Sequence, residues 1–157
     1  MPQRDSYNNL VPVQLLDPQA INDTDTKSKL LDTREHGTAL VLVPCGTFTG
    51  ADADSYVNLI LQESDTTADS DFTAVVTTDM IRAITTATAG LFGVVNSTSV
   101  DNALFKVGYI GSKRYIRVLL DFTTGTGGVS AANVAVLGVM TDPPRSPAAA
   151  VAAVAAT

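Results

Sequence analysis

The chain has 157 residues, of which 45% are hydrophobic, and a formal net charge of −6. This length favours a single domain, and a chain of this size buries about two-thirds of its unfolded surface, so it needs neither a disulfide nor a metal to fold. The acidic balance argues against a general nucleic-acid binder, whose affinity rests on Lys and Arg, and the single Cys45 excludes an internal disulfide.

The composition also bears on the fold class and on membranes. Thr, Val, Gly and Ser are abundant whereas Glu and Lys are sparse, and this mix suits an all-β protein better than a helical one. The polar start of the sequence predicts that there is no signal peptide. The longest apolar stretch, residues 147–156, is about half as long as a membrane span, so no membrane partner is expected.

Apolar runs separated by turn signals predict roughly seven or eight strands. Pro12 cannot donate to a ladder, so the first strand belongs at a sheet edge, and the continuous apolar run 38–43 predicts a buried strand. Residues 91–95 fit either a short strand or an inserted loop, and the Ala- and Thr-rich residues 83–89 are ambiguous. In chain order the expected strands are residues 10–16, 38–43, 56–64, 72–76, 80–81, 103–110, 113–122 and 133–140.

This pattern predicts a jelly-roll-like antiparallel β-sandwich with extended N- and C-terminal arms. Residues 1–20 are expected to form an N-terminal arm and edge segment, and residues 21–142 the β-sandwich domain. Residues 143–157 are expected to form a Pro/Ala-rich C-terminal arm. Pro143 and Pro144 give this arm a polyproline-like start.

The clearest fold signal lies in residues 103–122, which read as two strands around Gly111-Ser112. Glycine accepts the positive φ that a primed hairpin turn needs, so we expect an antiparallel hairpin in which Val107 faces Ile116. Side chains alternate between the two faces of a strand. The face expected to form a core comprises Phe105, Val107, Tyr109, Ile116, Val118, Leu120 and Phe122. The other face, half wet and basic, comprises Leu104, Lys106, Gly108, Lys113, Tyr115, Arg117 and Leu119.

The basic face of this hairpin is a candidate partner-binding surface. In the expected register Lys106 lies opposite Arg117, and like charges that face each other are destabilising, so an acidic group is expected nearby, on a neighbouring strand or on another molecule. Tyr115 lies in the same patch, and aromatic and Arg side chains are enriched in interface cores. A solvated face paired to the chain's own acids is the alternative. The candidate partner-binding residues, including those of the tail, are Lys106, Lys113, Tyr115, Arg117, Pro143, Pro144 and Arg145.

No catalytic, cofactor-binding or metal constellation is evident in the sequence. His36 is the single histidine, and no H-E-x-x-H, C-x-x-C, G-x-S-x-G or P-loop pattern is present, so we expect a loop histidine and no enzyme. Two acidic turns carry carboxylates at spacings that can suit calcium, but the EF-hand Gly and closing Glu are missing. Solvated turns are therefore the expectation, and calcium binding is the alternative. The turns contain Asp52, Asp54, Asp65, Asp69 and Asp71.

Five segments of the chain carry a family resemblance. They are Asp32–Arg34, Ala39–Val43, Leu61–Asp65, Phe105–Arg117 and Val134–Gly138. In that order they resemble a family of small structural proteins encoded among the head genes of tailed bacteriophages. Some relatives are capsid cement, or decoration, proteins with a jelly-roll-like β-sandwich, and many others are called virion proteins. The resemblance covers roughly residues 30–140 and includes no catalytic residues, and both ends of the chain depart from the pattern.

The resemblance implies a capsid cement protein on the outside of a phage shell, made in the host bacterial cytoplasm. Its expected partners are the major capsid protein and other copies of itself, as a dimer or trimer, with no nucleic acid and no membrane. Many copies on a lattice gain avidity even where each contact is weak. The arms are expected to dock by β-augmentation or in grooves.

Two alternatives to a cement protein remain open. Within the virion, the chain fits a head-to-tail connector or a tail protein. From another class, it fits a carbohydrate-binding β-sandwich for host adhesion. Such sites usually stack sugars on exposed aromatic side chains. This chain has no Trp and only four Tyr, so the sequence supports the carbohydrate-binding alternative less well. The four are Tyr7, Tyr56, Tyr109 and Tyr115.

Overall fold

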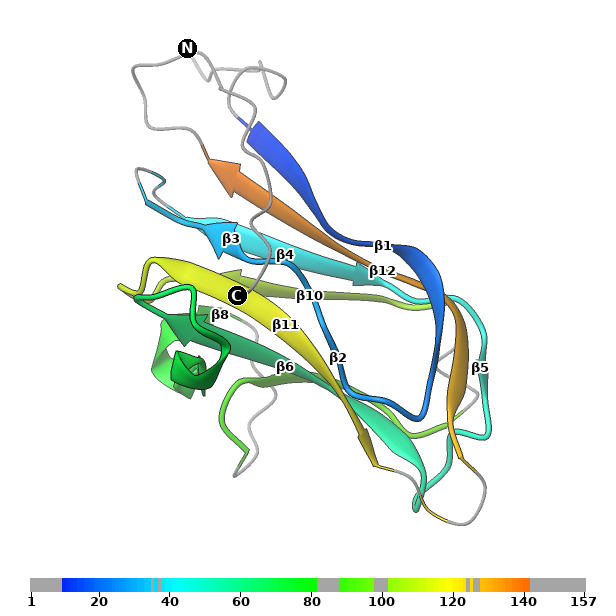
Figure 1. Cartoon of the computed structure of the whole chain (residues 1–157). Helices are drawn as coiled ribbons and strands as arrows, with labels where there is room; N and C mark the ends of the chain where they lie inside the picture. Colours follow the sequence, from blue (N-terminus) through cyan, green and yellow to red (C-terminus); the bar gives the residue numbers. More distant parts are fainter. Residues whose placement is uncertain are drawn as a thin grey trace.

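The computed structural model describes residues 10–34, 36, 38–81, 88–97, 102–123, 125 and 128–141. Two antiparallel sheets lie face to face in these ranges, which contain strands and two short 3₁₀ helices but no α-helix (Figure 1). The predicted all-β antiparallel sandwich is therefore confirmed. Residues 1–9 of the predicted N-terminal arm and the whole predicted C-terminal arm, residues 143–157, lie outside the described residues.

Sheet A has the strand order β1-β12-β4-β10-β8, and β5 pairs with the start of β12. All neighbouring strands in it are antiparallel. Its strands are β1 (Leu10–Asn22), β12 (Ser130–Thr141), β4 (Ala39–Pro44), β10 (Leu104–Tyr109), β8 (Met80–Ile81) and β5 (Phe48–Thr49).

Sheet B is built on the long pair of β11 and β6. The short strands β2 and β3 share the outer edge of β11, and β7 and β9 share the outer edge of β6. Its strands are β2 (Thr26–Lys27), β3 (Leu31–Asp32), β6 (Tyr56–Ser64), β7 (Thr73–Ala74), β9 (Leu91–Val95) and β11 (Tyr115–Thr123). The 3₁₀ helices η1 (Asp69–Asp71) and η2 (Thr77–Asp79) flank β7.

The strand β1 forms one edge of sheet A, as Pro12 predicted. Pro12 and Pro18 have no backbone N–H that could bind another strand, and three register shifts interrupt the pairing of β1 with β12. Both features discourage the strand of another molecule from pairing with this edge. The predicted boundary at residue 20 falls inside β1, so most of the predicted edge segment is part of the sheet. Leu10 faces Thr141, so the chain enters β1 and leaves β12 at the same end.

The predicted hairpin over residues 103–122 is wrong. The strand β10 belongs to sheet A and pairs with β4, whereas β11 belongs to sheet B and pairs with β6, so residues 110–114 cross from one layer to the other (Figure 1). Val107 faces Val41, and Ile116 faces Glu63. A hairpin and a crossing arch bury the same alternate side chains, because the inner faces of two stacked sheets point at each other. Alternation therefore revealed the inward residues but not the pairing partner.

Tyr109 organises this crossing. Its hydroxyl donates a 2.7 Å hydrogen bond to Glu63 on β6 and accepts one of 2.9 Å from the backbone N–H of Lys113. Burial first, and then the hydrogen bond to Glu63, raises the pKa of Tyr109. A Cβ at Gly111 would lie 2.5 Å from the Tyr109 hydroxyl oxygen. Gly111 is therefore needed because only a residue without a Cβ permits this close approach. The φ of Gly111 is not positive, so the glycine does not serve the primed turn that the sequence predicted.

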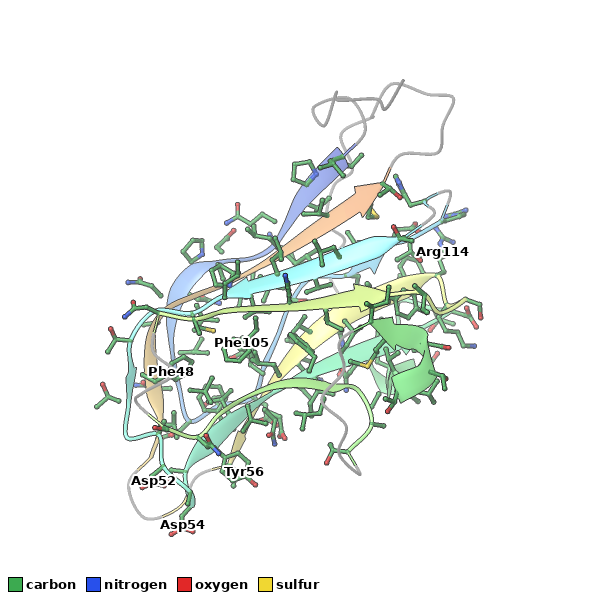
Figure 2. All side chains as sticks on the ribbon, turned by 180° about the vertical axis from the view of Figure 1, so that it is seen from behind. Phe48, Asp52, Asp54, Tyr56, Phe105 and Arg114 are labelled. Atoms are coloured by element: carbon green, nitrogen blue, oxygen red, sulfur yellow. The ribbon has the colours of Figure 1, made fainter. Side chains whose placement is uncertain are left out.

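The core lies between the two sheets and draws on both (Figure 2). The expected inward residues of β10 and β11 are confirmed: Val107, Ile116 and Val118 are buried, and Phe105 packs against them half-buried. The remaining large contributors come from β1, β4, β5, β6 and β12. They include Leu15, Val41, Val43, Phe48, Leu59, Leu61, Val136 and Met140.

Candidate partner-binding faces

The crossing at residues 110–114, called the arch from here on, divides the predicted basic face between the two sheets. Lys106 lies on the outer face of sheet A, opposite Leu42 of β4. Arg117 lies on the outer face of sheet B, opposite Gln62 of β6. The predicted juxtaposition of Lys106 with Arg117 is therefore wrong, since their strands are not neighbours in either sheet.

Arg117 is buried, with 2% of its surface exposed. Its Nε donates a 2.8 Å hydrogen bond to Gln62, and its guanidinium carbon lies 4.0 Å from the centre of the Phe72 ring. Its Nη1 also forms an ion pair with Asp69 of η1. The acidic partner that the sequence predicted for a crowded basic face is thus present, and it belongs to the same chain.

Tyr115 is buried beside Arg117. It packs with Leu30 and Phe72 in a small cluster separate from the main core, and the guanidinium carbon of Arg114 lies 4.6 Å from the centre of its ring. Tyr115 and Arg117 are therefore covered by their own chain, and a partner reaches them only if the segment around Phe72 moves. Their predicted partner contact stays a prediction.

The exposed cations near the arch also have partners in their own chain. Lys113 forms an ion pair with Asp65, and both side chains are about half exposed. Arg114 donates to both carboxylate oxygens of Asp32, with its Nη2 2.8 Å from Oδ2. The backbone N–H of Thr33 donates a 2.8 Å hydrogen bond to the carbonyl of Arg114. The tail members of the predicted set lie outside the described residues; they are Pro143, Pro144 and Arg145.

The acidic turns make local hydrogen bonds. Asp52 accepts from the backbone N–H groups of Asp54 and Ser55 at 2.9 and 2.7 Å, which closes the turn seen at one end of the sandwich in Figure 2. Asp71 accepts a 2.6 Å hydrogen bond from the Thr66 hydroxyl. Within the described ranges, no group of three or more His, Cys, Asp or Glu side chains is placed to hold a metal ion.

His36 and Cys45 take structural positions. The Nδ1 of His36 lies 3.2 Å from the carbonyl oxygen of Thr141, which ties the connection before β4 to the end of β12. Cys45 is 6% exposed, and burial raises the pKa of its thiol to about 12. The thiol is thus protonated and shielded at neutral pH.

Acid is expected to loosen the segment that carries Asp65 and Asp69. Hydrogen bonds from Lys27 and then Arg117 lower the pKa of Asp69 below its ordinary 3.8, and the hydrogen bond from Lys113 lowers that of Asp65. The unfolded chain therefore takes up protons first as the pH falls. The stabilisation is complete above about pH 5, begins to fall near 3.8, and is lost as the pH falls through the lower pKa of the folded state. Urea midpoints at pH 7 and pH 3 should differ less for Asp69→Asn than for the natural chain. An equal drop in both would contradict this assignment.

The outer face of sheet A is apolar, and sequence reasoning missed it as a surface. Of the six large hydrophobic side chains exposed in the described chain, four lie in strands of this sheet: Leu10, Leu40, Ile81 and Leu104. Leu40 faces Gly108 on one side and Val139 on the other, and Gly108 faces Ile81. Lys106 stands among them. We call this surface the sheet A face.

One signal in the sequence did point to the sheet A face. The continuous apolar run 38–43 predicted a strand buried on both sides, as such runs usually are. In β4, however, Val41 and Val43 are buried whereas Leu40 is 37% exposed. The outward side chains of β4 are therefore as apolar as those of a covered strand, which indicates a surface suited to a partner.

A shallow groove of about 420 Å³ crosses the sheet A face. Leu40, Ile81 and Val139 form its apolar walls, Gly108 its floor, and Lys106 and Thr141 contribute polar groups. A Cβ at Gly108 would lie 3.1 Å from the Ile81 Cβ, so any larger residue would fill the floor.

In the described part of the chain, no helix is long and apolar enough to cross a membrane.

Comparisons with known proteins do not identify a family. No protein-family model matches the chain, and no curated protein matches it. It is similar to the solved structure of SPBc2 prophage-derived protein YomS, at 10% identity and a TM-score of 0.45, over 85% of this chain and 95% of that one. It is also similar to a structure of the Gx strain of infectious bursal disease virus, at 14% identity and a TM-score of 0.25, over 84% of this chain and 39% of that one. Likenesses at these scores carry no argument about family or activity.

Proposed function

We propose that this chain is a structural virion protein of a tailed phage, namely a capsid cement protein that binds the outside of the shell. The observation that carries the proposal is the sheet A face, which concentrates four of the six exposed large hydrophobic side chains of the described chain. Such a concentration is typical of a protein–protein contact. The resemblance over residues 30–140 supplies the kind of partner, a phage shell.

The order of the strands supports the same class of protein. When β2 and β3 are counted as one strand and the shortest edge pieces are left out, the sheets read β1-β12-β4-β10 and β2/β3-β11-β6-β9. We interpret this order as that of a jelly roll, an eight-stranded double sheet found in viral capsid and lectin domains. A fold by itself does not decide function, so this order supports the class and not the partner.

In this proposal the sheet A face lies against the major capsid protein, and many copies act together. Leu40 and Ile81 supply apolar contact area, and Lys106 pairs with a carboxylate on the shell. Each contact can be weak, because a lattice of sites multiplies the effect of each. The proposal assigns no catalytic step to the chain and makes it a homo-oligomer on the capsid surface.

Ile81→Glu is expected to weaken binding to purified shells by about tenfold or more, because a charge would be buried in the centre of an apolar contact. Shells are incubated with each variant, sedimented and then heated while genome release is recorded. The natural chain should raise the rupture temperature, and Ile81→Glu should not. Val76→Glu is the matched control: Val76 is 51% exposed and Ile81 52%, but Val76 belongs to no strand of sheet A and does not line its groove.

Three results would contradict the proposal in different ways. Equal rupture temperatures with and without the natural chain would exclude a clamping role. Equal loss of binding in Val76→Glu and Ile81→Glu would exclude the sheet A face as the contact. A copy number per particle that matches a ring at one vertex, and not the lattice of the shell, would replace cement with the connector alternative.

A further inference from the structure

The groove on the sheet A face lies where the described chain ends. Thr141, the last residue of β12, lines the groove, and so does Leu10 at the start of β1. Residues 142–157 therefore begin at the edge of an apolar groove. Extended, this length reaches about 50 Å, whereas the five strands of sheet A span about 20 Å at their usual spacing. The segment is long enough to cross the whole face.

The chemistry of this segment matches the groove. Residues 147–156 are seven Ala, two Val and one Pro, with no charge. Small side chains suit a shallow groove whose floor is Gly108. Val151 and Val154 are three residues apart, so they point to the same side in a polyproline-type extended segment, which has three residues per turn. Both can then face the groove together.

We propose that residues 147–156 dock in cis on the sheet A face of the free protein, with Val151 and Val154 in the groove between Leu40 and Ile81. The tether from Thr141 gives the segment a high effective concentration at the groove.

This inference deepens the proposed function, on which only its biological consequence rests. If the sheet A face binds the shell, the docked segment is what the shell displaces. The free protein would then carry a covered apolar face. It would expose this face only on the lattice, where the avidity of many copies for the shell outweighs the binding of the tethered segment. Docking itself is a property of the isolated chain and is tested without shells.

Thiol labelling of Ile81→Cys tests the docking. In the full-length chain the new thiol should react about tenfold more slowly with iodoacetamide than in the same chain with Val151→Asp and Val154→Asp. Deletion of residues 146–157 should produce the same acceleration. Val76→Cys, placed off the face at equal exposure, should react at one rate in all three backgrounds. Cys45 is buried and reports on folding, since its labelling should stay slow throughout.

The outcomes separate this inference from the proposed function. Equal rates for Ile81→Cys with and without the Asp substitutions, while Cys45 stays protected, would overturn the docking. Protection that grows with protein concentration would place the segment on another copy and overturn the cis arrangement. Protection of Ile81→Cys in a chain whose natural form fails to bind shells would leave the docking intact and overturn the cement function alone.

Discussion

Arg117→Ala is expected to lower the free energy of unfolding by about 3 kcal/mol. The guanidinium is buried, stacks on Phe72, donates to Gln62 and pairs with Asp69. Its removal empties that space and leaves the amide oxygen of Gln62 without its donor. The side chain of Asp69 is 47% exposed, so water can replace part of the ion pair that it loses. The loss of stability should therefore lie at the lower end of the range for breaking a buried ion pair. Urea unfolding at pH 7 measures it.

Lys113→Ala is the control for this prediction. Lys113 also pairs with an acidic side chain, Asp65, but both are about half exposed, so its loss should barely move the urea midpoint. Arg117→Met should fall between the two variants, because it restores volume over Phe72 without the hydrogen bonds. If Arg117 lay on a free surface, as the sequence suggested, Arg117→Ala would behave like Lys113→Ala.

Gly90→Ala is expected to destabilise the fold by about 3 kcal/mol or more. Gly90 has φ +73°, and a Cβ there would overlap the carbonyl oxygen of Leu61. The carbonyl of Gly90 also accepts a 2.8 Å hydrogen bond from the N–H of Leu61, so the two backbones cannot separate without breaking this bond. The register of β9 against β6 shifts between Leu59 and Ile60, beside this contact. Thermal and urea unfolding should both show the loss.

Gly128→Ala is the matched control. Gly128 has a similar φ of +64°, but its added Cβ would meet a side-chain oxygen, that of Asp23, at 2.6 Å. A side chain can turn aside where a backbone cannot, although Asp23 would then weaken the hydrogen bond that its carboxylate accepts from the backbone N–H of Val129. This variant should therefore lose about 1–2 kcal/mol, less than Gly90→Ala. Equal losses in the two variants would show that the backbone contact at Gly90 contributes nothing beyond the conformation.

The strand β6 shows what local pattern determines. The sequence predicts a strand at residues 56–64, and the structure has it at Tyr56–Ser64. Val57, Leu59 and Leu61 were expected to share one face, and all three are fully buried. Alternation depends only on neighbours along the chain, so it is readable in a single sequence. The two-residue strands β2, β3 and β5 were missed because two residues hold no period.

The candidate site was only partly predictable for the same reason. Lys106 was correctly placed on an outer face, and an acid was correctly expected near Arg117. That acid is Asp69, 48 residues away in sequence, and Phe72 covers the guanidinium from the same segment. No pattern near Arg117 encodes this cover, because it results from the segment between β6 and β7 folding back over sheet B.

The sequence by itself determined an all-β chain, the inward side chains of its long strands and the edge position of β1. Only the tertiary structure decided that β10 and β11 belong to different sheets, because a hairpin and an arch bury the same alternate residues. It also decided which outer face is covered. Sheet B carries its own cover, held by Arg117, whereas sheet A presents Leu40 and Ile81. Burial depends on which distant segments pack together, and that information is absent from any short stretch of the chain.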